Sequence, residues 1–307
     1  REARASAASE LARAHQDAQV MRSLSEIGLR PLALKGAAYA HTIYPEAYLR
    51  PRCDTDLLFP DERHAQSAWN HLIQNGYAQA SNAVQGRFVS RQRTCVNPAC
   101  GGHAIDIHWA ISNTHTFVRA LPYAELEQQA VALPSLHETA RTLGSIHSLA
   151  FACLHLFGHQ EMESAPHLLW LYDIVLLARR LSLADWHGFV QAAIDKSIAG
   201  VCRHVLDTAD NSFPLPLPAF VRPALAKAEA NETFRPDRIR SPLQYALRDL
   251  QALEGWSAKA RWLLETLVPA PAYIRSKYPH ASRIWLPLLY VHRSAAGLAK
   301  RIRRNRG

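Results

Sequence analysis

Two aspartates, Asp54 and Asp56, are separated by one residue and are followed by the apolar residues Leu57 and Leu58. Side chains two positions apart on a strand point to the same face, about 7 Å apart along the chain. Their carboxylates could therefore converge on one or two hard divalent cations, Mg²⁺ or Mn²⁺, which take oxygen ligands. Taken alone, an Asp-x-Asp pair is more typical of an acidic strand end or turn, so the metal interpretation needs further residues.

A third carboxylate, Asp106, lies between Ile105 and Ile107 in a second predicted strand. If this strand neighbours the first, Asp106 could bind the same cation or accept a proton from an attacking hydroxyl. His108 is a candidate supporting residue two positions later, and with Trp109 it could stack on a nucleobase. We favour the alternative, an ordinary strand that continues past Asp106.

A cation and a glycine precede these carboxylates at a predicted strand-to-helix junction. Lys35 and Gly36 follow the apolar run 31–34, and Ala37 begins a predicted helix. A helix N-terminus presents free backbone N–H groups, and glycine lets a phosphate approach closely. We also expect Lys35 and Arg50 to pair with triphosphate oxygens. The candidate nucleotide-binding residues are Lys35, Gly36, Ala37 and Arg50.

Composition and periodicity predict the elements that must position these residues. We expect helices at 3–27, 37–44 and 61–74, strands at 31–34, 55–59 and 104–110, one or two weaker strands within 77–93, and a loop at 95–102. From residue 122 onward apolar residues recur at helical spacing. The predicted fold class is α+β, with an α/β domain containing a mixed sheet at 1–120 and an all-helical domain at 121–307 that ends in a basic tail.

Three segments of the chain together resemble the motifs of a known family. Residues 34–36, 50–58 and 105–109 look like those of the uncharacterised nucleotidyltransferase family, within the DNA polymerase β-like superfamily. The resemblance covers residues 1–120 well and the helical half more loosely. Members of this family occur beside genes for natural products, including lasso peptides, and for surface polysaccharides.

The resemblance implies a nucleotidyltransferase fold and a set of site residues. Asp54, Asp56 and Asp106 would be the catalytic and metal-binding carboxylates. Lys35 and Gly36 would contact the nucleotide. Ala37 stands where the superfamily usually has glycine or serine.

These residues predict a metal-dependent nucleotidyltransferase. A hydroxyl or phosphate of an acceptor would attack the α-phosphorus of an NTP such as ATP and release pyrophosphate. The sequence does not identify the acceptor, which could be a peptide, a small metabolite or a sugar phosphate. One alternative is an RNA- or tRNA-directed enzyme, which the net charge of +9 favours slightly. Another is a non-catalytic protein that binds a nucleotide and a partner.

Polar residues of the predicted helices admit a structural and a functional interpretation. Asp173 lies in an apolar helix, and a buried carboxylate needs a partner. It could support the active site or pair with a buried arginine or histidine, and we leave both open. His155 and His159 are four positions apart on one helix, where packing is favoured over metal binding. Ser182 and Asp185 form a capping-box signature at the start of a later helix.

The five cysteines are odd in number and lack the spacing of a disulfide scaffold, which is typical of a protein from a reducing cytoplasm. Cys95, Cys100 and His103 could contribute to a zinc site. Their spacing is not that of a standard zinc finger, so we favour a hairpin loop.

The composition is that of a globular protein. The chain has 307 residues, of which 48% are hydrophobic, so it can bury a substantial core. No apolar run reaches the roughly 18 residues needed to span a bilayer, and we expect a soluble, cytoplasmic protein. The first residue is Arg1, so whether a native segment precedes it stays open.

Overall fold

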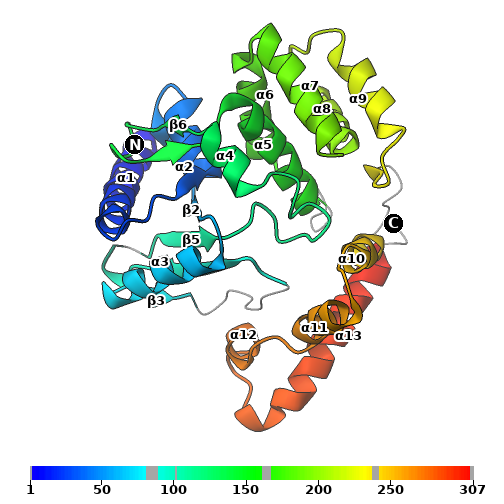
Figure 1. Ribbon diagram of the computed structural model, residues 1–307. Helices are drawn as coiled ribbons and strands as arrows, with labels where there is room; N and C mark the ends of the chain where they lie inside the picture. The colour runs from blue at the N-terminus through cyan, green and yellow to red at the C-terminus, as the bar shows by residue number, and fades with distance from the viewer. Residues whose placement is uncertain (1, 81–88, 101, 161–166, 237–241, 305–307) are drawn as a thin grey trace.

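The computed structural model describes every residue except 1, 81–88, 101, 161–166, 237–241 and 305–307. Within the described residues, seven strands form one mixed sheet in the order β3-β4-β5-β2-β1-β7-β6 (Figure 1). The strands are β1 (Leu32–Leu34), β2 (Asp54–Leu58), β3 (Ala78–Gln79), β4 (Gln92–Val96), β5 (Ala104–His108), β6 (Val131–Ala132) and β7 (Arg141–Thr142).

Helices flank the sheet and then make up the rest of the described chain. The α-helices are α1 (Glu2–Glu26), α2 (Lys35–Thr42), α3 (Glu62–Gln74), α4 (Tyr123–Gln128), α5 (Ser145–Gln160), α6 (Leu168–Arg180), α7 (Leu183–Asp195), α8 (Ala199–Ser212), α9 (Val221–Glu229), α10 (Pro242–Gln251), α11 (Trp256–Leu267), α12 (Pro271–Lys277) and α13 (Leu286–Arg304). Short 3₁₀ helices are η1 (Ala47–Leu49), η2 (Pro98–Cys100) and η4 (Arg283–Trp285). A mixed sheet followed by helices confirms the predicted α+β class. The capping box of Ser182 and Asp185 at the start of α7 is also confirmed.

Strand β2 lies in the middle of the sheet and sets the positions of the candidate site residues. It pairs antiparallel with β1 and parallel with β5, so Asp56 lies opposite Leu34 on one side and Asp106 on the other. Asp106 is paired in turn with Thr94 of β4. The two strands that carry the candidate carboxylates are therefore neighbours, as their proposed chemistry requires.

The two faces of the sheet are covered by different helices. Leu57 of β2 packs into a core that includes residues of α1 and α3. Leu58 points the other way, into a larger core built on α5 to α8. Because side chains alternate along a strand, Asp54 and Asp56 share the face of Leu58, whereas Thr55 faces α1. The carboxylates therefore lie between the sheet and the helical layer.

The sheet continues past residue 120. Strand β7 pairs in parallel with β1, and β6 pairs with β7, so both strands extend the edge next to β1. From Ser145 onward the described elements are helical. Helices α10 to α13 lie together, orange to red, apart from the sheet (Figure 1). The predicted division into domains at residue 120 stays a prediction.

Several predicted boundaries differ from the structure. Helix α2 spans Lys35–Thr42 instead of residues 37–44, and β5 ends at His108 instead of residue 110. Cys95 and Val96, placed in a loop from their sequence context, end β4 instead. Cys95 pairs with Ile105 and is fully buried, so its packing in the core outweighs the turn signals that follow it. Of the weak alternation at 77–93, the structure describes β3 and the start of β4, and residues 81–88 lie outside the described part. Among the described helices none combines the length and apolar character needed to cross a membrane.

Candidate active site

A cavity of about 380 Å³ opens between the sheet and helices α5 and α6. The β1–α2 junction, β2 and β5 form one side, and the loop after β5 borders it. The predicted site residues that line the cavity are Lys35, Gly36, Arg50, Asp54, Asp56, Asp106, His108 and Asp173. Ala37, the remaining candidate, is buried and does not line the cavity.

Three carboxylates from two strands form what we call the carboxylate floor: Asp54, Asp56 and Asp106. The parallel register places Asp56 beside Asp106, and Asp54 lies two residues before Asp56 on the same face of β2. Asp56, Asp106 and His108 each offer one ligand atom, and these atoms lie within 4.8 Å of one another. Among the described residues this is the group of histidine, cysteine and carboxylate side chains whose geometry could hold a metal ion.

Asp56 is the most deeply buried and the most strongly paired carboxylate of the floor. Nζ of Lys35 lies 2.6 Å from Oδ1 of Asp56, and Nε2 of His108 lies 2.8 Å from the same oxygen. Burial would raise the pKa of Asp56, but Lys35 and His108 hold that pKa well below its usual range. Asp56 therefore stays ionised at neutral pH.

The other two carboxylates experience the opposite balance. Burial first, and then the charges of Asp56 and Asp106, raise the pKa of Asp54 to about 6. Burial and the charge of Asp56 also raise the pKa of Asp106. Asp106 accepts hydrogen bonds from Thr94 Oγ1 at 2.5 Å and Gln92 Nε2 at 3.1 Å. The floor thus gathers more negative charge than Lys35 neutralises, and such a site attracts a cation.

The strand-to-helix junction holds Lys35 in an uncommon conformation. Lys35 has φ of 49°, in the left-handed region that non-glycine residues seldom adopt. It is also the first residue of α2, directly after β1. At the next position, a Cβ on Gly36 would lie 2.8 Å from Nη1 of Arg50. A side chain at position 36 would therefore displace the end of the Arg50 side chain, and glycine lets the arginine lie here beside the cavity.

Arg50 joins the sheet region to the helical layer. Its Nη2 donates to Oδ2 of Asp173 at 2.7 Å, and its Nε donates to Oδ1 of the same carboxylate at 3.3 Å. Tyr44 also donates to Asp173, at 2.8 Å. Burial raises the pKa of Asp173, although the bonds from Arg50 oppose this effect. Of the two interpretations left open for Asp173, the structure shows the pairing with a buried arginine, and it does so at the cavity wall.

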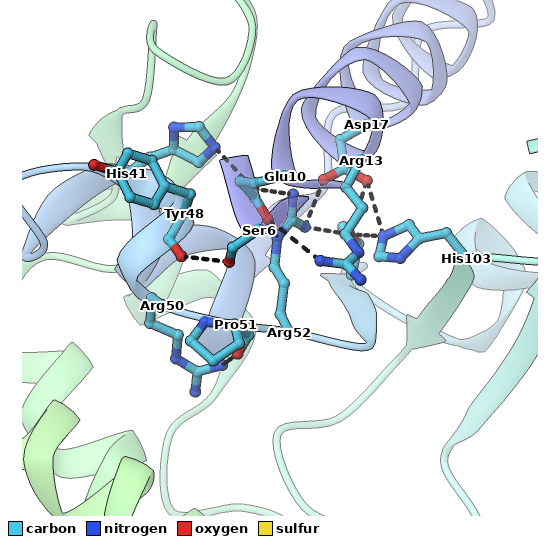
Figure 2. A network of polar contacts seen from close by, with 11 residues as sticks. Ser6, Glu10, Arg13, Asp17, His41, Tyr48, Arg50, Pro51, Arg52 and His103 are labelled. Carbon is cyan, nitrogen blue, oxygen red and sulfur yellow. Dashed lines mark hydrogen bonds and ion pairs between the residues drawn. The ribbon is translucent and has the colours of Figure 1, made fainter. Parts of the chain in front are cut away.

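A second polar network lies on the opposite face of β2. Arg52, two residues after Arg50, donates to Glu10 and Asp17 of α1, with a shortest distance of 2.6 Å to Asp17 (Figure 2). Thr55 donates to Asp17 at 2.7 Å, and His103 Nε2 lies 2.8 Å from the hydroxyl of Thr55. This network ties α1 to the start of β2. The segment that carries Asp54 and Asp56 is therefore anchored on both sides.

Sequence reasoning underestimated the contribution of α5 and α6. Three ring side chains from these helices line the cavity opposite the carboxylates, and we call them the ring wall: His155, His159 and Trp170. The spacing of the two histidines was visible in the sequence, and it favoured plain helix packing. No sequence pattern singled out Trp170 as a site residue. The same is true of Gln92 and Thr94, which donate hydrogen bonds to Asp106.

The zinc alternative for Cys95, Cys100 and His103 gains no support from the described atoms. The thiol of Cys95 is buried in the core and its Sγ lies 3.8 Å from the carbonyl oxygen of Ile105. His103 is bonded to Thr55 in the network against α1. The side chain of Cys100 lies outside the described part of the structure.

Comparison with known proteins returns one family. The family model described as an uncharacterised nucleotidyltransferase matches residues 1–214. The matched region extends from α1 past the end of α8, so it contains the whole carboxylate floor and the ring wall. A search of curated proteins found no match.

Proposed function

The chain belongs to the family of uncharacterised nucleotidyltransferases, and from this premise we propose that it moves a nucleoside monophosphate from an NTP to an acceptor. The acceptor would supply a hydroxyl or phosphate oxygen, and pyrophosphate would be released. The observation that supports the proposal most directly is the carboxylate floor: Asp56 and Asp106 lie side by side on parallel strands, and both face one cavity with Asp54.

The donor set of the floor fits a hard divalent cation. Asp56 and Asp106 offer carboxylate oxygens, which are the ligands that Mg²⁺ and Mn²⁺ prefer, in the group that also contains His108. Asp54 lies outside that group and would add a third carboxylate from the same face of β2. Burial first, and then the charges of Asp56 and Asp106, raise the pKa of Asp54, and a bound cation would offset both effects by favouring the ionised carboxylate. When bound, the cation would neutralise phosphate charge and favour ionisation of the attacking oxygen.

A carboxylate of the floor could also accept the proton that the acceptor hydroxyl loses. The acceptor oxygen forms a bond to the α-phosphorus, and the bond from that phosphorus to the pyrophosphate oxygen breaks with its electron pair. The proton of an acceptor hydroxyl must go to a base within hydrogen-bond reach. Asp106 suits this role because its carboxylate lines the cavity beside Asp56, on the neighbouring parallel strand.

Two cationic side chains would orient the triphosphate. Arg50 has five N–H donors, and the bonds to Asp173 and to the carbonyl oxygen of Pro51 use three of them. The remaining donors belong to a guanidinium that lines the cavity. Lys35 can donate to a phosphate oxygen while one of its three N–H groups remains on Asp56. Gly36 contributes the space that lets Arg50 approach.

The acceptor would be a peptide, a small metabolite or a sugar phosphate. Because phosphoryl transfer depends mostly on positioning and charge stabilisation, the same floor could serve any of these hydroxyl groups.

The proposal is tested by nucleotide binding and pyrophosphate release. We expect an NTP with Mg²⁺ or Mn²⁺ at 100 times its dissociation constant to stabilise the protein by about 2.7 kcal/mol in thermal unfolding. The double substitution Asp54→Asn with Asp56→Asn should abolish this metal-dependent stabilisation and any pyrophosphate release. Asp195→Asn, which alters an exposed carboxylate at the end of α7, is the matched control and should behave like the wild type. Absence of stabilisation by any NTP with either metal would contradict the proposal.

A further inference from the structure

The cavity has two chemically different sides. The carboxylate floor is charged and belongs to the sheet, whereas the ring wall of His155, His159 and Trp170 belongs to α5 and α6. Asp173 also lies on the helical side, but its carboxylate is bonded to Arg50 and Tyr44.

The rings of the wall lie against one another as a cluster. The ring centroid of Trp170 lies 4.6 Å from that of His155 and 4.9 Å from that of His159. The two histidine rings are 4.6 Å apart. Rings in mutual contact lose little further freedom when a ligand binds, because their conformations are already restricted.

His155 of the ring wall is buried and does not add a charge to the cavity. Burial first, and then the charge of Lys35, lower the pKa of His155 well below its ordinary value. His155 is therefore neutral at pH 7 and offers no positive charge for a phosphate group. The flat faces and edges of these rings suit an uncharged aromatic ligand instead.

A nucleoside triphosphate combines a charged part with an uncharged aromatic part, and these two parts match the two sides of the cavity. Its phosphates carry the negative charge that a cation on the floor would bind, and its base is a flat, uncharged aromatic system. We propose that the ring wall binds the nucleobase of the NTP, with the triphosphate directed toward the carboxylate floor. This inference rests on the proposed function and adds to it the site that holds the base.

The inference predicts that losing a ring weakens nucleotide binding and leaves the binding of phosphate alone unchanged. Stacking of a base on an aromatic side chain contributes about 1–3 kcal/mol, so its removal should weaken binding about 5- to 100-fold. An inert packing role for Trp170 would instead lower thermal stability and affect both kinds of ligand equally.

The test measures calorimetric binding of two probes to the full chain with Mg²⁺. The first probe is the tightest of the four α,β-methylene analogues of ATP, GTP, CTP and UTP, and the second is inorganic tripolyphosphate. Trp170→Leu and His159→Leu should each weaken the analogue at least about fivefold while tripolyphosphate binds as in the wild type. Trp170→Phe, which keeps an aromatic face, should restore most of the affinity.

A second measurement uses the wild type only, so its result does not depend on whether a variant folds. A photoreactive azido derivative of the tightest analogue should label peptides of α5 or α6. Wild-type analogue affinity in both leucine variants, or labelling confined to the sheet and the loop after β5, would overturn the inference and leave the proposed function intact. If neither the analogues nor tripolyphosphate bind the wild type, the proposed function and this inference fail together.

Discussion

The two faces of strand β2 both carry buried polar side chains, but the charges are balanced on one face only. Toward α1, Arg52 lies between Glu10 and Asp17, and Nη1 of Arg13 lies 3.9 Å from Glu10, so two cations face two carboxylates. Burial would raise the pKa of Asp17, but His103, Arg52 and Thr55 lower it. Toward α5 and α6, the pKa of Asp54 is raised to about 6.

The difference separates a structural network from a candidate site. Carboxylates whose pKa values are lowered by fixed partners stabilise the fold in their ionised form. Carboxylates that raise one another's pKa values destabilise the fold unless a ligand compensates, and such groups concentrate at functional sites. The cavity lies on the face with the unbalanced charge, and helix α1 covers the other face near Arg52. Charge balance thus distinguishes two networks that look alike in composition.

The largest expected effect is on catalysis, from the unbalanced face. Asp106→Asn keeps the size of the side chain and its bonding to Thr94, but it removes one negative charge and the proposed base. We expect pyrophosphate release to fall by about a thousandfold, a loss typical of removing one well-placed catalytic group. Circular dichroism and the melting temperature should stay close to those of the wild type. A variant that retains most of its activity would show that Asp106 lies outside the chemistry.

On the face toward α1, we expect a substitution to lower the stability of the protein and to leave its activity unchanged. Asp17 is fully buried, and Asp17→Asn leaves Arg52 with Glu10 as its remaining acidic partner. Because removing one partner of a buried ion pair is costly, we expect a loss of about 3 kcal/mol in the free energy of unfolding, measured by urea denaturation. Below the midpoint of unfolding the variant should bind NTP normally. A folded variant with impaired binding would indicate that this network reaches the site.

The smallest expected effect is a pH dependence of opposite sign on the two faces. The folded-state pKa of Asp54 is raised from 3.8 to about 6, so the folded protein binds this proton more tightly than the unfolded chain does. Without divalent cations, the contribution of Asp54 should therefore decrease stability as pH rises through this window, by at most about 3 kcal/mol. Asp17, whose pKa is lowered, stabilises above its unfolded value of 3.8 and loses this contribution as pH falls below it.

Thermal unfolding in a chelator from pH 4 to pH 7 tests the contribution of Asp54, because that of Asp17 changes only below this range. Asp54→Asn should be more stable than the wild type near pH 7 and should approach it near pH 4. Added Mg²⁺ should reduce the difference, because the cation binds the ionised site. A wild type and an Asp54→Asn variant with parallel stability curves would contradict the unbalanced charge on this face.

Local sequence patterns predict several features of the candidate site. The alternation of Asp54, Thr55 and Asp56 predicts which side chains share a face, because the strand period of two is a local property. The apolar run before Lys35 and the helix that follows it likewise depend on neighbouring residues. The two strands and the helix are confirmed by β2, β1 and α2, although α2 begins at Lys35, two residues before the predicted start.

Other features depend on residues far apart in the sequence. Arg50 was predicted to contact triphosphate, but its partner Asp173 lies 123 positions away. The ring wall approaches the floor only because α5 and α6 pack on the same face of the sheet as Leu58. No local propensity contains this information, since the same helices could cover either face.

Short runs of residues predict the candidate carboxylates, their strands and the family to which the chain belongs. The sequence does not predict that Asp56 lies beside Asp106, that Arg50 and Arg52 point to opposite faces, or that α5 and α6 complete the cavity. These features depend on strand pairing and helix packing, which are fixed by burial of the whole core. The excess of negative charge at the cavity is a consequence of this packing.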